Sequence, residues 1–84
     1  MTVRIRLFAS LREAVGRSEL ELELPESATP ETAWERLSAA TPSLAGRRPS
    51  LSAAVNRRYV PFDTALREGD ELVFIPPVSG GTSS

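Results

Sequence analysis

The residues with the clearest chemical meaning lie near the end of the chain, where Gly80 and Gly81 follow the segment Pro76-Pro77-Val78-Ser79. Proline fixes φ and has no amide hydrogen, so strand pairing must stop at Pro76 and the chain must leave as a stiff extended arm. Glycine has no side chain and nearly free backbone torsions, so the tip of this arm is bare. The combination of a stiff arm and a bare tip predicts a chain end that is inserted into a narrow channel.

The rest of the composition leaves the chain poorly equipped for catalysis on its own. It has no cysteine, and therefore no thiolate nucleophile, disulfide or soft metal site. It has no histidine, which is the commonest metal ligand and the usual general base. All ten basic residues are arginine, so no internal lysine amine can accept an isopeptide bond. We therefore expect no metal site and no self-contained catalysis.

Size and charge restrict the class of protein further. A chain of 84 residues is one small domain. A net charge of −1, with both signs mixed along the chain, argues against a nucleic-acid partner. No apolar run approaches the ~20 residues of a membrane-spanning helix, and the N-terminus lacks the order of a signal peptide. We expect a cytoplasmic protein with no membrane partner.

Two strands of alternating polarity are predicted near the start of the chain. Residues 3–8 alternate apolar residues with arginine before reaching Phe8, and residues 19–24 alternate glutamate with leucine. If these strands pair antiparallel, the arginines can face the glutamates, which is worth a few tenths to ~1 kcal/mol per pair and helps to fix the register. Between them, residues 11–15 fit a turn or two of helix that Gly16 ends.

One long helix is predicted in the middle of the chain. Thr29 is a hydroxyl N-cap, Pro30 stands at the first helical position, and Glu31 lies near the positive end of the helix dipole. Pro42 ends the helix. The apolar stripe expected to pack on the sheet consists of Ala33, Trp34, Leu37 and Ala40 or Thr41.

The second half of the chain completes a two-layer domain. Residues 43–50 are predicted as a loop. The remaining elements, in order, are a strand at 51–55, a turn at 56–58, a short edge strand at 59–60, a single helical turn at 64–66 and an apolar strand at 72–75. This order predicts an α+β roll, a mixed sheet of about four to five strands with one main helix packed on one face. The first two strands should be antiparallel neighbours, and the first and last a parallel central pair.

Strand alternation also predicts an interface patch on the outer face of the sheet. If the apolar residues of the first strand face the helix, Phe8 shares the outer face with the arginines. If Leu72 and Phe74 face inward, Val73 and Ile75 face outward. An exposed phenylalanine and isoleucine beside each other, close to the tail, are typical of a binding surface.

Several sequence blocks together resemble the small-subunit family of molybdopterin synthase. They are Phe8-Ala-Ser-Leu-Arg-Glu13 with Gly16, Val55-Asn56 with Tyr59-Val60, Leu66-Arg-Glu-Gly-Asp-Glu71, and Phe74-Ile-Pro-Pro-Val-Ser-Gly-Gly81. The resemblance runs from Val3 to Gly81, and the last block is the most specific. It implies a β-grasp (ubiquitin-like) domain over residues 1–78, followed by a flexible tail over residues 79–84.

The resemblance also implies a sulfur-carrying role. An E1-like enzyme adenylates the carboxylate of Gly81, and sulfur from a persulfide donor replaces the AMP, which leaves a thiocarboxylate. This tail enters the large synthase subunit and gives its sulfur to precursor Z, while Gly80 lets the tail pass a tight channel. On this basis the chain binds no cofactor, the activating partner uses the ATP, and the chain is a non-catalytic subunit of a heterotetrameric sulfurtransferase.

The same resemblance assigns the partner-binding residues. The family's apolar patch maps onto Phe8, Tyr59 and Ile75. Arg12 either orders the turn after the first strand or pairs with an acidic residue of a partner. The base of the tail adds Pro76, Pro77 and Val78 to this predicted site.

The chain departs from the family pattern after Gly81, because Thr82-Ser83-Ser84 follow. Adenylation needs a free carboxylate on Gly81. Three explanations stay open: a protease removes the three residues, they are foreign to the natural chain, or the protein has kept the fold without the carrier role. Two alternative functions also stay open, a sulfur carrier for thiamine, cysteine or tRNA thiolation, and a ubiquitin-like modifier or interaction domain.

Overall fold

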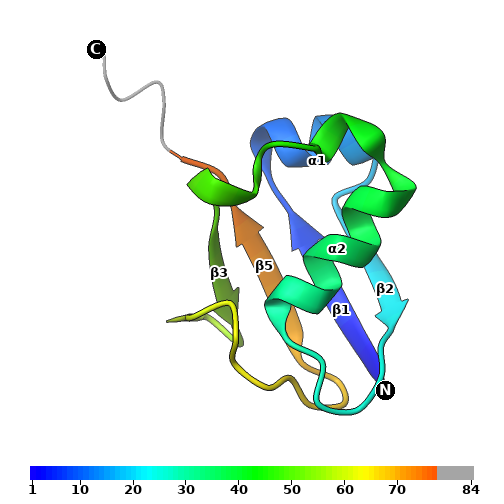
Figure 1. Ribbon diagram of the computed structural model, residues 1–84, viewed down its shortest axis with the longest axis vertical. Coiled ribbons are helices and arrows are strands. Elements are labelled where there is room, and N and C mark those ends of the chain that lie inside the picture. The colour runs from blue at the N-terminus through cyan, green and yellow to red at the C-terminus, as the bar shows by residue number, and fades with distance from the viewer. Residues whose placement is uncertain (78–84) are drawn as a thin grey trace.

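The computed structural model describes residues 1–77 and shows one mixed sheet with helices on one face (Figure 1). The strands are β1 (Thr2–Leu7), β2 (Glu19–Glu23), β3 (Ser52–Val55), β4 (Arg58–Val60) and β5 (Glu71–Ile75). The helices are α1 (Ala9–Val15) and α2 (Pro30–Ala40), with the 3-10 turns η1 (Pro42–Leu44) and η2 (Arg48–Ser50). No helix in this described part is long and apolar enough to cross a membrane. The predicted α+β roll is confirmed.

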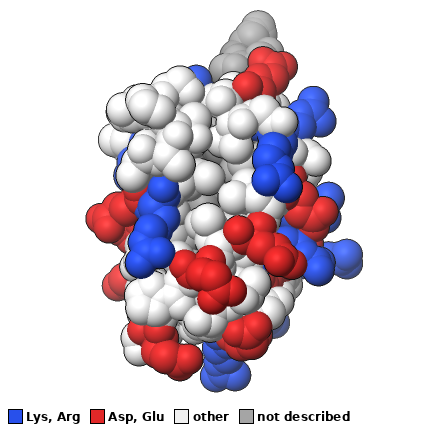
Figure 2. Space-filling view, turned by 90° about the vertical axis from the view of Figure 1, so that its right-hand side faces the viewer, with Lys and Arg blue, Asp and Glu red and all other residues white. Residues whose placement is uncertain are grey.

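The strand order is β2-β1-β5-β3-β4, so β1 and β5 occupy the interior of the sheet. They pair parallel, as predicted, and β1 pairs antiparallel with β2. The register sets Arg4 opposite Glu21 and Arg6 opposite Glu19. The Arg4 Nε lies 3.4 Å from a Glu19 oxygen on the diagonal, whereas the Arg6 guanidinium turns to Glu71 of β5 at 3.5 Å. Figure 2 shows acidic and basic side chains interspersed on one side of the molecule.

The core lies between the sheet and α2, which crosses the front of the sheet in Figure 1. Phe74 of β5 is 0% exposed and meets Trp34 of α2 edge to face, with ring centroids 5.1 Å apart. The apolar stripe of α2 ends one turn earlier than predicted, because Ala40 is exposed. The buried residues contributed by β1, α2 and β5 are Val3, Ile5, Leu7, Pro30, Ala33, Trp34, Leu37, Leu72 and Phe74.

The helix α2 begins where the sequence predicts. The Thr29 hydroxyl accepts a hydrogen bond from the Thr32 amide at 3.3 Å, and the Thr32 hydroxyl accepts one from the Thr29 amide at 3.2 Å. These two bonds satisfy amide groups that the first turn of a helix leaves without partners. Pro30 occupies the first helical position, where its missing amide hydrogen costs nothing.

Two connecting segments differ from the prediction. The predicted loop at 43–50 contains η1 and η2, and Leu44 within it is fully buried. The predicted helical turn at 64–66 is wrong: the chain turns earlier, where the Thr64 amide donates to the Pro61 carbonyl at 3.2 Å. Leu66 then lies extended and buried, with its amide bonded to the Ala28 carbonyl at 2.8 Å. Tertiary contacts therefore determine the conformation of both segments.

Candidate partner-binding site at the base of the tail

The strand that leads to the tail is fixed on both sides. β5 pairs parallel with β1 and antiparallel with β3. Its inward residues Leu72 and Phe74 are fully buried. Pro76 and Pro77 follow directly, and the chain leaves the sheet beside the start of α1 (Figure 1). β5 is therefore a central strand, as predicted, and it leads directly into Pro76 and Pro77. Val78, Gly80 and Gly81 of the predicted site lie outside the described residues.

The outer face of the sheet carries a continuous row of side chains. The register aligns four residues across four strands: Arg6, Val73, Ala54 and Tyr59. Because neighbouring residues of a strand point to opposite faces, these side chains lie on the face away from the buried row that contains Phe74.

The next row on this face contains two predicted site residues. Phe8 follows β1 in extended conformation, and Ile75 ends β5. The Arg6 guanidinium carbon lies 5.7 Å from the centre of the Phe8 ring, as expected for residues on one face. We call Arg6, Phe8, Ala54, Tyr59, Val73 and Ile75 the sheet-face patch.

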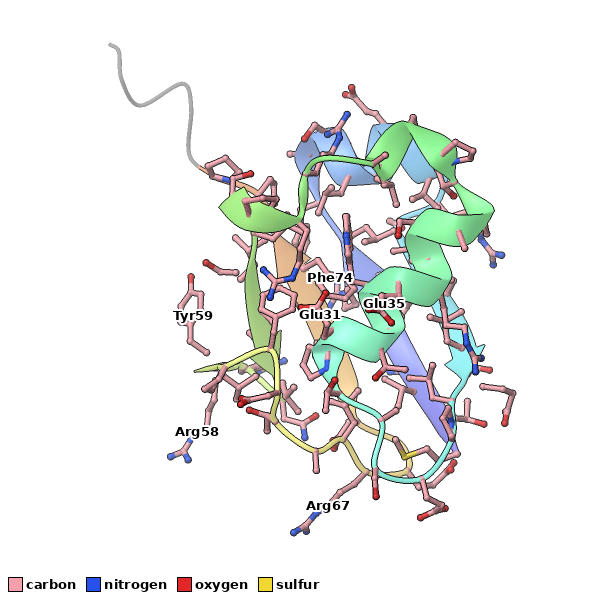
Figure 3. The ribbon with its side chains drawn as sticks, viewed as in Figure 1. Glu31, Glu35, Arg58, Tyr59, Arg67 and Phe74 are labelled. Atoms are coloured by element: carbon pink, nitrogen blue, oxygen red, sulfur yellow. The ribbon has the colours of Figure 1, made fainter. Side chains whose placement is uncertain are left out.

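Exposure distinguishes the members of the sheet-face patch. Phe8 is 45% exposed and Tyr59 is 75% exposed, and in residues 1–77 these are the only exposed large hydrophobic side chains. Figure 3 shows Tyr59 at the β4 edge, pointing away from the core residue Phe74. Val73 and Ile75 are half-buried between them. Phe8 and Tyr59 are three strands apart, which corresponds to about 14 Å at the usual strand spacing. The patch is thus broad, with aliphatic residues at its centre.

Arg12 lies on the short helix α1, where its backbone carbonyl accepts the hydrogen bond that caps the helix. The donor is the Gly16 amide at 2.8 Å, and Gly16 adopts the left-handed conformation with φ of 86°. The exposed side chain of Arg12 makes no hydrogen bond or ion pair within residues 1–77. The side chain therefore takes no part in ordering the turn in this structure.

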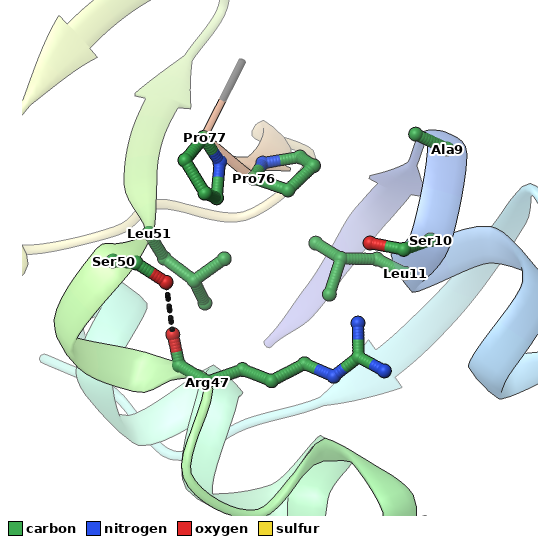
Figure 4. A pocket seen from close by; sticks show the side chains of 8 residues that line it. All are labelled: Ala9, Ser10, Leu11, Arg47, Ser50, Leu51, Pro76 and Pro77. Carbon is green, nitrogen blue, oxygen red and sulfur yellow. Dashed lines mark hydrogen bonds between the residues drawn. The ribbon is translucent and has the colours of Figure 1, made fainter. Parts of the chain in front are cut away.

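A pocket of about 300 Å³ lies beside Pro76 and Pro77 on the helix side of the sheet (Figure 4). Sequence reasoning missed it, because its Arg47 belongs to the segment predicted as a loop. Of the residues that line it, only Pro76 and Pro77, which we call the exit prolines, were predicted as site residues. No group of three potential metal ligands occurs among the described residues. We call this cavity the exit pocket, and it is lined by Ala9, Ser10, Leu11, Arg47, Ser50, Leu51, Pro76 and Pro77.

Comparison with known proteins decides the family. The model of the ThiS family matches residues 5–81, which is nearly the whole chain. The chain belongs to the ThiS family. This ThiS-family chain is 39% identical over 83 residues to the molybdopterin synthase sulfur carrier subunit of Chlamydomonas reinhardtii, covering 96% of the chain and 100% of that protein. It is 34% identical to small archaeal modifier protein 3 of Haloferax volcanii, covering 96% and 100%.

The solved structures agree with this ThiS-family assignment. The crystal structure of SAMP1 from Haloferax volcanii matches with a TM-score of 0.86 and 29% identity, covering 96% of the chain and 100% of that structure. The fold is the ubiquitin-like β-grasp, as the resemblance implied. The resemblance to molybdopterin synthase sulfur carrier subunits is likewise confirmed. The family match includes both glycines and ends at Gly81.

Proposed function

We propose that this ThiS-family chain is the sulfur carrier subunit of a molybdopterin synthase. The observation that carries the proposal is the 39% identity to a relative of that name, over 96% of this chain and 100% of the relative. The family match that ends at Gly81 supports a functional end at this glycine. The absence of cysteine, histidine and lysine from the sequence supports a carrier on which partners perform the chemistry.

The proposed chemistry takes place at the carboxylate of Gly81 after a protease has removed residues 82–84. A carboxylate is a poor electrophile, so an activating enzyme transfers AMP from ATP to its oxygen and releases pyrophosphate. A persulfide attacks the acyl carbon and displaces AMP, and a thiol then reduces the sulfur–sulfur bond to leave the thiocarboxylate. The thiocarboxylate sulfur forms a bond to a carbon of precursor Z and displaces an oxygen leaving group from that carbon. Water cleaves the resulting thioester, which leaves sulfur on the product and restores the carboxylate.

The geometry of the described residues suits delivery of such a tail. The tail follows a strand that is paired on both sides and is stiffened at once by Pro76 and Pro77. The sheet-face patch lies next to this exit and offers two exposed aromatic residues. Aromatic side chains with surrounding aliphatic contacts often supply most of the binding energy of an interface. We therefore propose that the large synthase subunit binds the sheet-face patch and takes up the tail.

Binding of the large synthase subunit from the same organism tests this proposal. A chain that ends at Gly81 should bind, and Phe8→Ala and Ile75→Ala should each weaken binding by about tenfold or more, which corresponds to ~1.4 kcal/mol. Glu35→Ala is the matched control, because Glu35 is exposed on α2, on the other side of the sheet (Figure 3). Failure of the chain that ends at Gly81, without further substitution, to bind this subunit would contradict the proposal.

A second candidate function is a ubiquitin-like protein modifier, which the 34% identity to a small archaeal modifier protein favours. Both functions begin with activation of the same glycine, and they differ in the acceptor. A modifier would form an isopeptide between Gly81 and a lysine of another protein. Peptide mass spectrometry of the host proteome distinguishes the two, since only a modifier leaves its C-terminal residues on target lysines. A pull-down from native extract separates the synthase from other sulfur acceptors, such as those of thiamine, cysteine or tRNA thiolation.

A further inference from the structure

The exit pocket contains a cation that no anion within residues 1–77 neutralises. Arg47 is half-buried, and its guanidinium makes no hydrogen bond or ion pair in the described part of the chain. The next residue, Arg48, differs sharply, since its guanidinium lies 2.7 Å from a Glu31 oxygen and 3.4 Å from the Phe62 ring centre. Arg48 is therefore neutralised within the domain, whereas Arg47 has no charge partner within residues 1–77.

The position of Arg47 directs its charge into the exit pocket. In Figure 4 its side chain runs from the η2 side, beneath the pocket, towards Ser10 and Leu11 on the α1 side. The Ser50 hydroxyl donates to the Arg47 backbone carbonyl at 3.1 Å, which fixes the start of the side chain. The walls around the guanidinium are largely apolar, with Leu11 and Leu51 both buried. A cation in apolar surroundings attracts a carboxylate more strongly than one in water.

Residues of the exit pocket are sequence neighbours of residues in the sheet-face patch at two points. Ala9 of the pocket follows Phe8 of the patch, and Pro76 of the pocket follows Ile75 of the patch. The patch and the pocket therefore adjoin where β1 and β5 end, so a partner that covers this end of the sheet can contact both. Ala9 also has a φ of 51°, a left-handed conformation that is unfavourable for a residue other than glycine. Strain of this kind is concentrated at functional sites.

We propose that the exit pocket receives an apolar side chain of the large synthase subunit and that an adjacent aspartate or glutamate of that subunit pairs with Arg47. The volume of about 300 Å³ is sufficient for one large side chain with its neighbouring carboxylate. Contact on the sheet-face patch and in the exit pocket would hold the tail from both sides and fix the direction of Pro76 and Pro77. This inference rests on the proposed function, and it adds a second contact surface with a charge requirement.

Charge reversal of Arg47 tests the inference. With the purified large subunit and a chain that ends at Gly81, Arg47→Glu should raise Kd by about tenfold or more, and Arg47→Ala should raise it less while reducing the salt dependence of binding. The matched control is Arg67→Glu, which makes the same change in net charge at the opposite end of the molecule (Figure 3). Urea unfolding of each variant verifies that the fold is unchanged.

The outcomes separate the inference from the proposed function. If the unmodified chain does not bind, the proposed function fails. The inference is overturned if the chain that ends at Gly81 binds the large subunit and its Arg47→Glu variant binds that subunit equally well. It is also overturned if Arg47→Glu loses affinity only for the activating enzyme.

A site-directed crosslink identifies the occupant of the exit pocket directly. Because the chain has no cysteine, Ser10→Cys gives a single thiol at the pocket for a photoreactive label. The crosslinked peptide should come from the large subunit and should carry an aspartate or glutamate beside an apolar residue. A crosslink to a segment without an acidic residue would overturn the proposed pairing with Arg47.

Discussion

Phe8 and Phe74, two of the three phenylalanines, occupy opposite faces of the sheet and differ in exposure. Phe74 is 0% exposed and lies between Trp34, at 5.1 Å, and Phe62, at 6.1 Å between ring centres. Phe8 is 45% exposed, and a guanidinium lies 5.7 Å from its ring centre. Burial of the aromatic ring in the first case stabilises the fold, whereas exposure in the second leaves the ring free for a partner.

Truncation of each ring should separate these roles. We expect Phe74→Ala to lower the free energy of unfolding by about 3–5 kcal/mol, because it removes a buried ring and leaves a cavity. Phe8→Ala should change it by less than ~0.5 kcal/mol, as is usual for exposed positions. Urea denaturation measures both. Equal destabilisation by the two variants would show that Phe8 belongs to the core and is absent from the binding face.

Strand periodicity explains why the sequence predicts part of the site and misses the rest. Side chains alternate with a period of two, so the alternation around Phe8 and Ile75 is enough to assign both residues to the outer face. The same alternation places Arg6 on this face, whereas Ala54 joins the patch only once the strand order aligns β3 with β5. That order depends on contacts far apart in the sequence, which periodicity does not encode.

At the scale of elements, one arginine side chain links the connection between α2 and β3 back to α2. Arg48 of η2 reaches back to α2, where its Nε and Nη2 lie 2.8 Å and 2.7 Å from the same Glu31 oxygen. The guanidinium also lies 3.4 Å from the centre of the Phe62 ring, and Phe62 stacks on Phe74 of the core. Composition alone suggested a loop here, because 3-10 turns are short and carry no periodic signal. The same error concealed Arg47 and the exit pocket.

Replacement of Arg48 should loosen this connection. Arg48→Ala is expected to lower the free energy of unfolding by about 1–2 kcal/mol, most of it from the lost contact with Phe62, since partly exposed ion pairs contribute little. Glu31→Gln removes only the ion pair and should cost less. Thermal unfolding in low and high salt measures both contributions. An equal loss in the two variants would mean that the ion pair, and not the aromatic contact, holds η2.

The hairpin between β3 and β4 contains a residue in an unfavourable conformation. Asn56 and Arg57 have φ of 51° and 73°, as a two-residue hairpin turn with both central residues left-handed requires. Asn56 tolerates this conformation, and its amide group bonds to Asp70 at 3.0 Å and to the Glu71 amide at 3.1 Å. The side chain of Arg57 makes no hydrogen bond or ion pair within the described residues.

Glycine at position 57 should therefore stabilise the protein. Arg57→Gly is expected to raise the free energy of unfolding by up to about 1 kcal/mol, which in a domain of this size raises Tm by about 4–8 °C per kcal/mol. Asn56→Gly is the matched control, and it should lower Tm because two side-chain hydrogen bonds are lost. Differential scanning calorimetry measures both. A lower Tm for Arg57→Gly would contradict the turn geometry.

At the scale of the whole molecule, the residues that stabilise the described fold are separate from the glycine on which we propose that partners act. All the buried hydrophobic residues lie between Val3 and Phe74, so the described core is complete before the exit prolines. The sheet-face patch and the exit pocket flank the point where the chain leaves this core. This arrangement is consistent with the proposed function, in which partners contact the surface around the exit of the chain and act on Gly81.

The intact mass of the protein, purified at native levels from its own host, tests the central claim most directly. A sulfur carrier should yield a species that ends at Gly81 with one carboxylate oxygen replaced by sulfur. Deletion of Gly81 should abolish this species and leave Tm unchanged, since the tail follows the core. A protein found only as the full chain ending at Ser84, with no shorter or sulfur-bearing form, would contradict the claim and favour an interaction domain that keeps the β-grasp fold without carrying sulfur.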